Sequence, residues 1–286
     1  LTGAPLPTTV EEGRTAFASL CCHPGEVPAP AACPTEQRAV SFQNVSLSYR
    51  SVKGEPRTIF DGLNLDIRKG EKVALIGSNG AGKSTLMKLM VGLLRPQSGT
   101  ISLFDEPIGA KKAEDLSRQI SLVYQNPEEM FIKDSIRSDI AYAMQVRGLP
   151  DWLTQLQDRD GRLMSGGQMR RASLAIGVAL EPGILLLDEP TANLDIATRR
   201  EIMGVLEDMK DIIQTAVIAT HDMQLVCQWA ERIIVLRGGQ VVADGTRDEI
   251  FSRQDLADLV AMRQNLAGLE FYPIYVLDLS TVHFVK

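Results

Sequence analysis

The sequence predicts an α/β fold built on a phosphate-binding loop, and three apolar strands with their flanks support this prediction. The segment 72–76 is a short, continuous apolar strand that runs directly into a glycine-rich loop and a helical stretch. The segment 183–187 is a second apolar strand and ends in two acidic residues, and the segment 216–220 is followed by a histidine. Because continuous apolar strands are typical of parallel sheets buried on both faces, we expect these polar ends to lie at one sheet edge.

The composition is that of an ordinary globular protein. The chain has 286 residues, of which 44% are apolar and 23% charged, close to the averages of about 45–50% and 25%, which excludes collagen-like, mucin-like and wholly disordered chains. Its formal net charge of −6 argues against a general affinity for nucleic acid. No apolar run approaches the ~20 residues of a membrane-spanning helix, so any work at a membrane is expected to require a partner chain.

Residues 1–38 are expected to form a proline-rich linker or leader. Six of the 14 prolines fall in residues 1–34, with short polar and alanine-rich pieces between them. Cys21, Cys22, His23 and Cys33 match no common zinc-site spacing, so we expect unpaired thiols in a reducing cytosol rather than a metal site. The chain begins with leucine, and we expect it to be a fragment or a processed form.

Two segments of alternating apolar residues, 40–49 and 59–67, predict strands of an antiparallel layer at about 39–75. The alternation slips once, at Asn44, and a Gly54-Glu55-Pro56 turn separates the two segments.

The segment 77–85 has the pattern G-x-x-x-x-G-K-[ST], directly after a strand and before a helix expected at 86–94. Its glycines let successive backbone N–H groups converge on phosphate oxygens, and the start of the helix adds partial positive charge. Lys83 is expected to reach the β- and γ-phosphates of a nucleotide, and the Ser84 hydroxyl to ligate Mg²⁺. The other expected nucleotide contacts are Ser78, Asn79, Gly80, Ala81, Gly82 and Thr85.

The two acidic residues after the second strand are candidates for metal binding and catalysis. Asp188 is well placed to hold Mg²⁺, directly or through water, and Glu189 can polarise an attacking water as a general base. A strand that merely ends in solvated acids is the structural alternative. Together with the phosphate loop, the pair predicts hydrolysis of a nucleoside triphosphate.

The segment 163–171, Leu-Met-Ser-Gly-Gly-Gln-Met-Arg-Arg, precedes an apolar-periodic helix at 172–180 and offers a second anion-binding helix start. It resembles the signature sequence of the ATP-binding-cassette (ABC) ATPases, and the other motifs follow that family's order. The resemblance covers about 39–253. It implies a P-loop NTPase (RecA-like) core with an antiparallel β subdomain and an inserted α-helical subdomain at about 126–180. Residues 254–286 are expected to form a C-terminal helix and an unassigned tail.

The resemblance also implies roles for single residues. Tyr49 would stack on adenine, Gln125 would sense Mg²⁺ and the γ-phosphate at the start of the Q-loop, and His221 would contact the γ-phosphate. Asp195 would belong to the D-loop, 192–195. Each has a structural alternative, because Tyr49 could be an ordinary strand aromatic, His221 a capping or core histidine, and Asp195 the N-cap of a helix that begins near 196.

In the ABC family the signature loop completes the nucleotide site of a second subunit. The resemblance therefore implies that two cassettes sandwich two ATP molecules, with Mg²⁺. The partner would be an identical copy or the other half of a tandem protein. The residues that would touch the nucleotide held by the partner are Ser165, Gly166, Gly167 and Gln168.

Two segments, 124–131 and 164–173, are similar to the energy-coupling-factor (ECF) type importers, the second segment to the second cassette of tandem members. This implies an ATPase at the cytoplasmic face of the membrane that powers import of a vitamin, vitamin precursor or metal ion through a transmembrane subunit. The segment 131–144 would receive a coupling helix of that subunit. The interval 125–165 is shorter than expected of the family, and a helix is missing around 151–153.

Three alternatives remain beside this hypothesis. The chain could serve another class of ABC transporter, or it could be a non-transport ABC ATPase acting on ribosomes or DNA, which we expect to carry basic extensions or coiled-coil insertions that this chain lacks. A catalytically idle module is disfavoured because Lys83, Asp188, Glu189 and His221 are all present.

Overall fold

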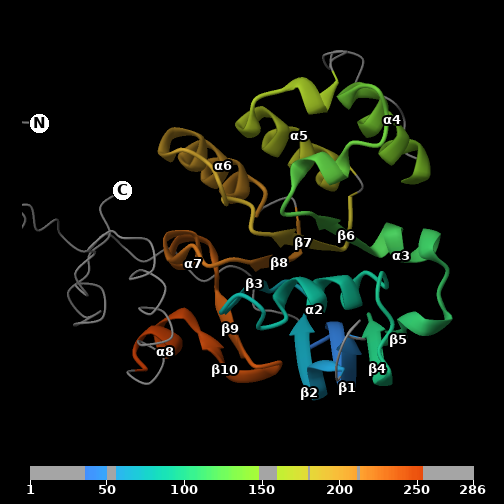
Figure 1. Ribbon diagram of the computed structural model, residues 1–286, viewed down its shortest axis with the longest axis vertical. Helices are drawn as coiled ribbons and strands as arrows, with labels where there is room; N and C mark the ends of the chain where they lie inside the picture. The colour runs from blue at the N-terminus through green and yellow to red at the C-terminus, as the bar shows by residue number, and fades with distance from the viewer. Residues whose placement is uncertain (1–35, 50–55, 148–159, 180, 211–212, 254–286) are drawn as a thin grey trace, which may run out of the picture. The chain divides into compact units, whose positions relative to one another are not determined.

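Two β-sheets and a set of helices make up the computed structural model, which describes residues 36–49, 56–147, 160–179, 181–210 and 213–253 (Figure 1). Residues 1–35, most of the expected proline-rich leader at 1–38, and residues 254–286 lie outside the described residues. So does the region around 151–153, for which a missing helix was predicted. Among the described residues, no helix is both long and apolar enough to cross a bilayer.

The four-stranded sheet has the order β2-β1-β4-β5 and is antiparallel throughout. The slip in alternation at Asn44 is a real irregularity, because Asn44 has a φ of 51° and the register shifts between Phe42 and Val45. Polar positions beyond the slip face outward again, so the strand keeps one apolar face in the core. The strands are β1 (Arg38–Tyr49), β2 (Arg57–Arg68), β4 (Ser98–Leu103) and β5 (Glu106–Pro107).

The expected limits of this layer, 39–75, are wrong at one end. The strand that begins at Lys72 belongs to the other sheet, and β4 and β5 take the place beside β1. Neither strand was expected from the sequence, because β4 buries only alternate residues over a short span and β5 has two residues.

The six-stranded sheet has the order β10-β9-β3-β8-β7-β6, and all its strand pairs are parallel except β10 with β9. Every residue of β6, β7 and β8 is buried, as expected of continuous apolar strands covered on both faces. The strands are β3 (Lys72–Gly77), β6 (Ile120–Val123), β7 (Ile184–Asp188), β8 (Thr215–Ala219), β9 (Arg232–Arg237) and β10 (Gln240–Thr246).

The helices cover both faces of the parallel sheet. Figure 1 shows α2 between the two sheets, where its Leu86, Met87 and Met90 share a core cluster with both of them. On the other face, α6 and α7 contribute Leu206 and Trp229 to a second cluster. The helices are α2 (Lys83–Met90), α3 (Ala113–Gln119), α4 (Ile136–Arg147), α5 (Gly166–Ala179), α6 (Ile196–Asp208), α7 (Met223–Trp229) and α8 (Arg247–Phe251), with short 3₁₀ helices at Ile108–Ala110, Pro127–Met130 and Gly161–Leu163.

A third, smaller core cluster joins α4 to α5 and contains Ile136, Ile140 and Ile176. Ile132, in the segment 131–144 that would receive a coupling helix, lies before α4 and is 72% exposed. Ile136 and Ile140 of the same segment are buried, so the segment packs only in part. The parallel strands β3, β6, β7 and β8 end next to one another, which brings the loops after them to one edge of the sheet.

Candidate functional site

A cavity of about 360 Å³ lies at the carboxyl ends of the parallel strands and is closed on one side by β1 and β2. Most of the residues that the sequence singled out line it. The lining consists of Tyr49, Arg57, Ile59, Asn79, Gly80, Gly82, Lys83, Ser84, Thr85, Gln125, Asp188, Glu189 and His221. Ser78, the four signature residues 165–168 and Asp195 are not part of this lining, and Ala81 is buried in the core cluster between the sheets.

The loop before α2 lines the cavity with Asn79, Gly80 and Gly82. Gly82 is the N-cap of α2 and has a φ of 107°, and no side chain caps this helix start. A Cβ at Gly82 would lie 2.8 Å from Cζ of Phe60, so both the conformation and the space require glycine. A helix start that lacks a side-chain cap and lines a cavity is suited to bind an anion through its free N–H groups.

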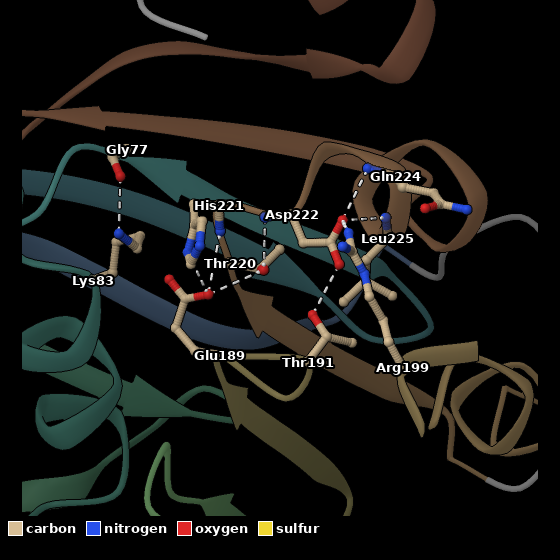
Figure 2. Close-up of polar contacts among 10 residues, drawn as sticks. All are labelled: Gly77, Lys83, Glu189, Thr191, Arg199, Thr220, His221, Asp222, Gln224 and Leu225. Carbon is tan, nitrogen blue, oxygen red and sulfur yellow. Dashed lines mark hydrogen bonds and ion pairs between the residues drawn. The ribbon is translucent and has the colours of Figure 1, made fainter. Parts of the chain in front are cut away.

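Lys83 supplies positive charge at the loop before α2. Its Nζ donates a hydrogen bond to the carbonyl oxygen of Gly77, at 2.8 Å (Figure 2). The residue is buried, so its ammonium group is held over the loop rather than free in solvent. This position suits contact with phosphate oxygens.

Asp188, the last residue of β7, is a buried carboxylate in an unusual environment. Burial raises its pKa, although a hydrogen bond from Ser84 and the charge of Lys83 act in the opposite direction. Its Oδ1 is buried and has no hydrogen-bond partner among the described residues. This oxygen, the Ser84 hydroxyl and the side-chain oxygen of Gln125 belong to residues that line one cavity. Together they are hard oxygen donors that fit a small divalent cation.

Glu189 follows immediately and has three partners on one oxygen. His221 Nδ1 lies 2.8 Å from its Oε2, which also accepts hydrogen bonds from Thr220 Oγ1 at 3.1 Å and from the backbone N–H of His221 at 3.3 Å (Figure 2). Burial by itself would raise the pKa of Glu189, but the hydrogen bond and charge of His221, with the charge of Lys83, outweigh it and lower the pKa. The environment thus favours the ionised form of Glu189, whereas burial opposes the ionised form of its neighbour Asp188.

The backbone at Glu189 is itself strained. Its φ is 47°, which is uncommon for a residue with a side chain. Its N–H donates to the carbonyl oxygen of Ala219 at 2.8 Å, and its carbonyl oxygen accepts from Ala192 N at 3.1 Å. These bonds hold the turn after β7 against the end of β8, and the turn directs the carboxylate toward His221.

The signature segment lies apart from this cavity and caps its own helix. Ser165 Oγ accepts a bond from Gln168 N at 3.4 Å, and Gln168 Oε1 accepts from Ser165 N at 3.1 Å, the reciprocal arrangement of a capping box at the start of α5. Gly167 lies close to α6, because a Cβ there would be 2.5 Å from Cγ2 of Thr198. The structure therefore does not bring this segment to the nucleotide cavity of the same chain.

Asp195 has the structural role that the sequence suggested as one of its two roles. It is the N-cap of α6, and its carboxylate accepts from Thr198 N at 3.0 Å and from Thr198 Oγ1 at 2.7 Å. The hydrogen bond from the Thr198 hydroxyl is the larger cause, and that from the Thr198 N–H the second, of a lowered pKa for Asp195.

Three arginines around the site were not expected from the sequence. Arg170 of α5 is buried and donates to the carbonyl oxygens of Tyr124, at 3.0 Å, and Gln125, at 2.6 Å, so it holds the start of the Q-loop. Arg57 pairs opposite Tyr49 in the antiparallel sheet and lines the cavity. Arg199 contacts the residue after His221. The contacts of Arg170 and Arg199 join segments far apart in the chain, so strand alternation does not predict them.

Tyr49 is half-exposed at the rim of the cavity. Its Oη lies 3.5 Å from Oγ1 of Thr85, which brings the ring to the start of α2. An exposed ring in this position can stack on a planar base whose phosphates lie in the loop.

The comparisons with known proteins agree with this geometry. A family model described as ABC transporter matches residues 60–192. The energy-coupling factor transporter ATP-binding protein EcfA1 of Lacticaseibacillus paracasei is 35% identical over 228 residues, which cover 74% of this chain and 81% of that protein. A relative from Methanosarcina acetivorans is 33% identical over 243 residues, and the chain spans only 39% of its length.

A solved structure with a similar fold is that of cbiO1 from Clostridium perfringens, described as part of the ABC transporter complex cbiONQ. It has a TM-score of 0.61 and 29% sequence identity, and the match covers 82% of this chain and 98% of that one. The phosphate loop, the paired acids and the histidine thus occur in a chain with the sequence and fold of a cassette. The chain belongs to the family of ABC transporter ATP-binding proteins, the ABC ATPases.

Proposed function

We propose that this chain hydrolyses ATP in its 360 Å³ cavity, with Glu189 as general base and His221 as the group that orients it. The contrast between the two adjacent carboxylates carries the proposal. Asp188 has a raised pKa and an unpartnered buried oxygen, whereas Glu189 has a lowered pKa and three polar contacts from two residues, Thr220 and His221. Neighbouring acids in opposite environments are typical of sites in which each acid has a different task.

The nucleotide would lie with its base on Tyr49 and its phosphates in the loop 78–85. The N–H groups at the start of α2 and the ammonium group of Lys83 would bind the β- and γ-phosphates. Arg57, which lines the same cavity opposite Tyr49, adds positive charge beside the loop.

Asp188, Ser84 and Gln125 would hold Mg²⁺. Their oxygens are the hard donors that this ion prefers. When bound, the ion supplies charge neutralisation at the transferring phosphoryl group. Arg170, by holding the carbonyl oxygens of Tyr124 and Gln125, keeps the Gln125 backbone next to that position.

Glu189 would accept a proton from the attacking water. Oε2 of its carboxylate is occupied by Thr220 and His221, which leaves Oε1 for the water. The lowered pKa keeps the group ionised at neutral pH, as a base requires.

The signature segment would act on the nucleotide of a second cassette. Ser165 and Gln168 are away from the cavity of their own chain, and the neighbouring Leu163 is 86% exposed. An identical copy and the other half of a tandem protein are both compatible partners. The Methanosarcina acetivorans relative, of which this chain spans 39%, is long enough for a second cassette.

The transport role rests on the named relatives. We propose that the chain lies at the cytoplasmic face of the membrane, bound to a transmembrane subunit, and that hydrolysis powers import of a vitamin, vitamin precursor or metal ion. The ECF name of the relative from Lacticaseibacillus paracasei supports this class. The exposed Ile132 at the start of the helical subdomain, about 126–180, offers a contact for the membrane subunit.

The experiment that tests the catalytic proposal compares Glu189→Gln with Glu114→Gln, an exposed acid on α3. Glu189→Gln is expected to lower turnover by at least about a hundredfold while the affinity for ATP stays within a few-fold. Glu114→Gln should match the wild type. Wild-type turnover in Glu189→Gln would overturn the assignment. Recovery of the tagged chain with ribosomes, instead of with a membrane protein, would reverse the choice of a transporter.

A further inference from the structure

Asp222, which does not line the cavity, collects contacts from three separate segments. Its Oδ1 accepts from the backbone N–H groups of Gln224, at 3.1 Å, and Leu225, at 3.2 Å, and it forms an ion pair with Arg199 of α6 (Figure 2). Its Oδ2 accepts from the hydroxyl of Thr191 at 2.9 Å. The residue is 8% exposed, so this carboxylate is a buried charge whose position its partners determine.

A chain of hydrogen bonds joins Asp222 to Glu189. The backbone N–H of Asp222 donates to Thr220 Oγ1 at 3.0 Å, and that hydroxyl donates to Glu189 Oε2 at 3.1 Å. His221 lies between Thr220 and Asp222 in sequence and contacts the same oxygen of Glu189. A displacement of Asp222 would therefore move the groups that hold the general base.

Asp222 also contacts a residue on each side of the D-loop, 192–195, namely Thr191 before it and Arg199 after it. Arg199 is in the first turn of α6, where its backbone N–H donates to the carbonyl oxygen of Asp195 at 2.9 Å. In Figure 2 the side chains of Thr191 and Arg199 converge on the Asp222 carboxylate from the same side. The D-loop is thus tied to the loop that carries His221 through one carboxylate.

We propose that Arg199 is a positioning residue. Through its ion pair with Asp222, and together with the Thr191 hydrogen bond to the same carboxylate, it holds the D-loop against the loop 220–222, which carries the hydrogen-bond donors to Glu189. The D-loop segment is exposed at Asn193 and Asp195, whereas Asp222 is buried. A displacement of the D-loop by another molecule would therefore reach His221 through Arg199 and Asp222. This inference rests on the catalytic roles proposed for Glu189 and His221.

A purely structural role is the alternative, because Asp222 caps α7. For this reason Asp222 is left intact in the test. Arg199→Ala removes the ion pair, Arg199→Lys restores a positive charge, and Thr191→Val removes one hydroxyl at nearly constant volume. Arg200→Ala is the matched control, since Arg200 is the next residue of α6 and its side chain is exposed.

The first measurement is hydrogen exchange of the full-length chain, followed in peptides that cover 220–226. Arg199→Ala is expected to speed exchange of the His221, Gln224 and Leu225 amides by about threefold or more, while peptides from β8 and the Arg200→Ala protein stay as in the wild type. Unchanged exchange at 220–226 would overturn the proposal whatever the activity is.

The second measurement is steady-state ATP hydrolysis. Arg199→Ala should lower kcat by about tenfold with a KM for ATP within about twofold, and Arg199→Lys should recover part of the loss. Thr191→Val should lower kcat in the same direction and be non-additive with Arg199→Ala, as expected of residues in one network. Equal losses in Arg200→Ala, or a loss confined to KM, would overturn the proposal.

These two measurements separate this inference from the proposed catalytic roles. Altered exchange at 220–226 together with full turnover in Glu189→Gln would leave the physical link intact and remove the general-base assignment. Normal exchange in Arg199→Ala with no turnover in Glu189→Gln would remove the physical link and leave the general-base assignment intact.

Discussion

At the scale of single residues, function in this chain conflicts with stability. Asp188 is a buried carboxylate with an unpartnered oxygen, and burial raises its pKa. A raised pKa means that the folded chain holds the proton to a higher pH than the unfolded chain does, so ionisation at neutral pH costs free energy of folding. A residue selected only for stability would not be an aspartate at this position.

Asp188→Asn is therefore expected to stabilise the chain when neither ATP nor Mg²⁺ is present. At neutral pH the midpoint of thermal unfolding should rise by about 2–4 °C, which corresponds to roughly 1 kcal/mol in a domain of this size. The gain should shrink as the pH falls and disappear below the ordinary Asp value of 3.8, because both states are then protonated and the wild type loses its penalty. Calorimetry across this pH range measures it.

The control for this prediction is Asp61→Asn, an exposed acid of β2, which should leave the midpoint within about 1 °C, as usual for surface substitutions. Adding ATP and Mg²⁺ should stabilise the wild type by mass action and Asp188→Asn much less. A lower midpoint for Asp188→Asn at neutral pH would contradict the argument.

At the scale of elements, the features that could be predicted are those formed by contiguous stretches of sequence. The strand 72–76, the loop 77–85 and the helix after it are contiguous, and β3 and α2 appear there, although α2 begins at Lys83 and ends at Met90 rather than at 94. The pairing of β4 with β1 and the hold of Arg170 on the Q-loop were not predictable. Both join residues far apart in sequence, and neither a short half-buried strand nor an arginine on an apolar helix carries a local signal for its partner.

The phosphate loop is an element whose conformation requires glycine at position 82. Gly82→Ala should destabilise the chain by about 1–3 kcal/mol, since it combines a left-handed φ with a contact of 2.8 Å to Phe60. It should also weaken ATP binding, because the N–H groups at the start of α2 would turn away. Denaturant unfolding and nucleotide titration measure the two effects.

The matched control is Gly204→Ala, in the exposed face of α6, where a Cβ would meet nothing within 4 Å. It should stabilise the chain by about 0.5–1 kcal/mol, the usual gain for alanine over glycine in a helix, with ATP binding unchanged. If Gly82→Ala were as well tolerated as Gly204→Ala, the loop would not need its left-handed turn.

At the scale of the whole molecule, the site is divided. The cavity holds the phosphate loop, the two acids and the histidine, whereas the signature segment caps its own helix elsewhere. Leu163 lies just before the signature segment and is 86% exposed, and Ile196 lies just after the D-loop and is 73% exposed. Large apolar side chains in such positions are typical of surfaces that another molecule covers.

Leu163→Ser should therefore weaken association of two cassettes without affecting nucleotide binding to one. The test uses the Glu189→Gln background, in which bound ATP is expected to persist, and measures mass by light scattering with ATP and Mg²⁺. The dimeric fraction should fall several-fold with Leu163→Ser, because a buried leucine at an interface contributes about 1.5–3 kcal/mol. Leu93→Ser, which removes a leucine that is 58% exposed just after α2, is the control and should leave the dimeric fraction unchanged. If Leu163→Ser dimerises as well as the parent, the second cassette does not cover this surface.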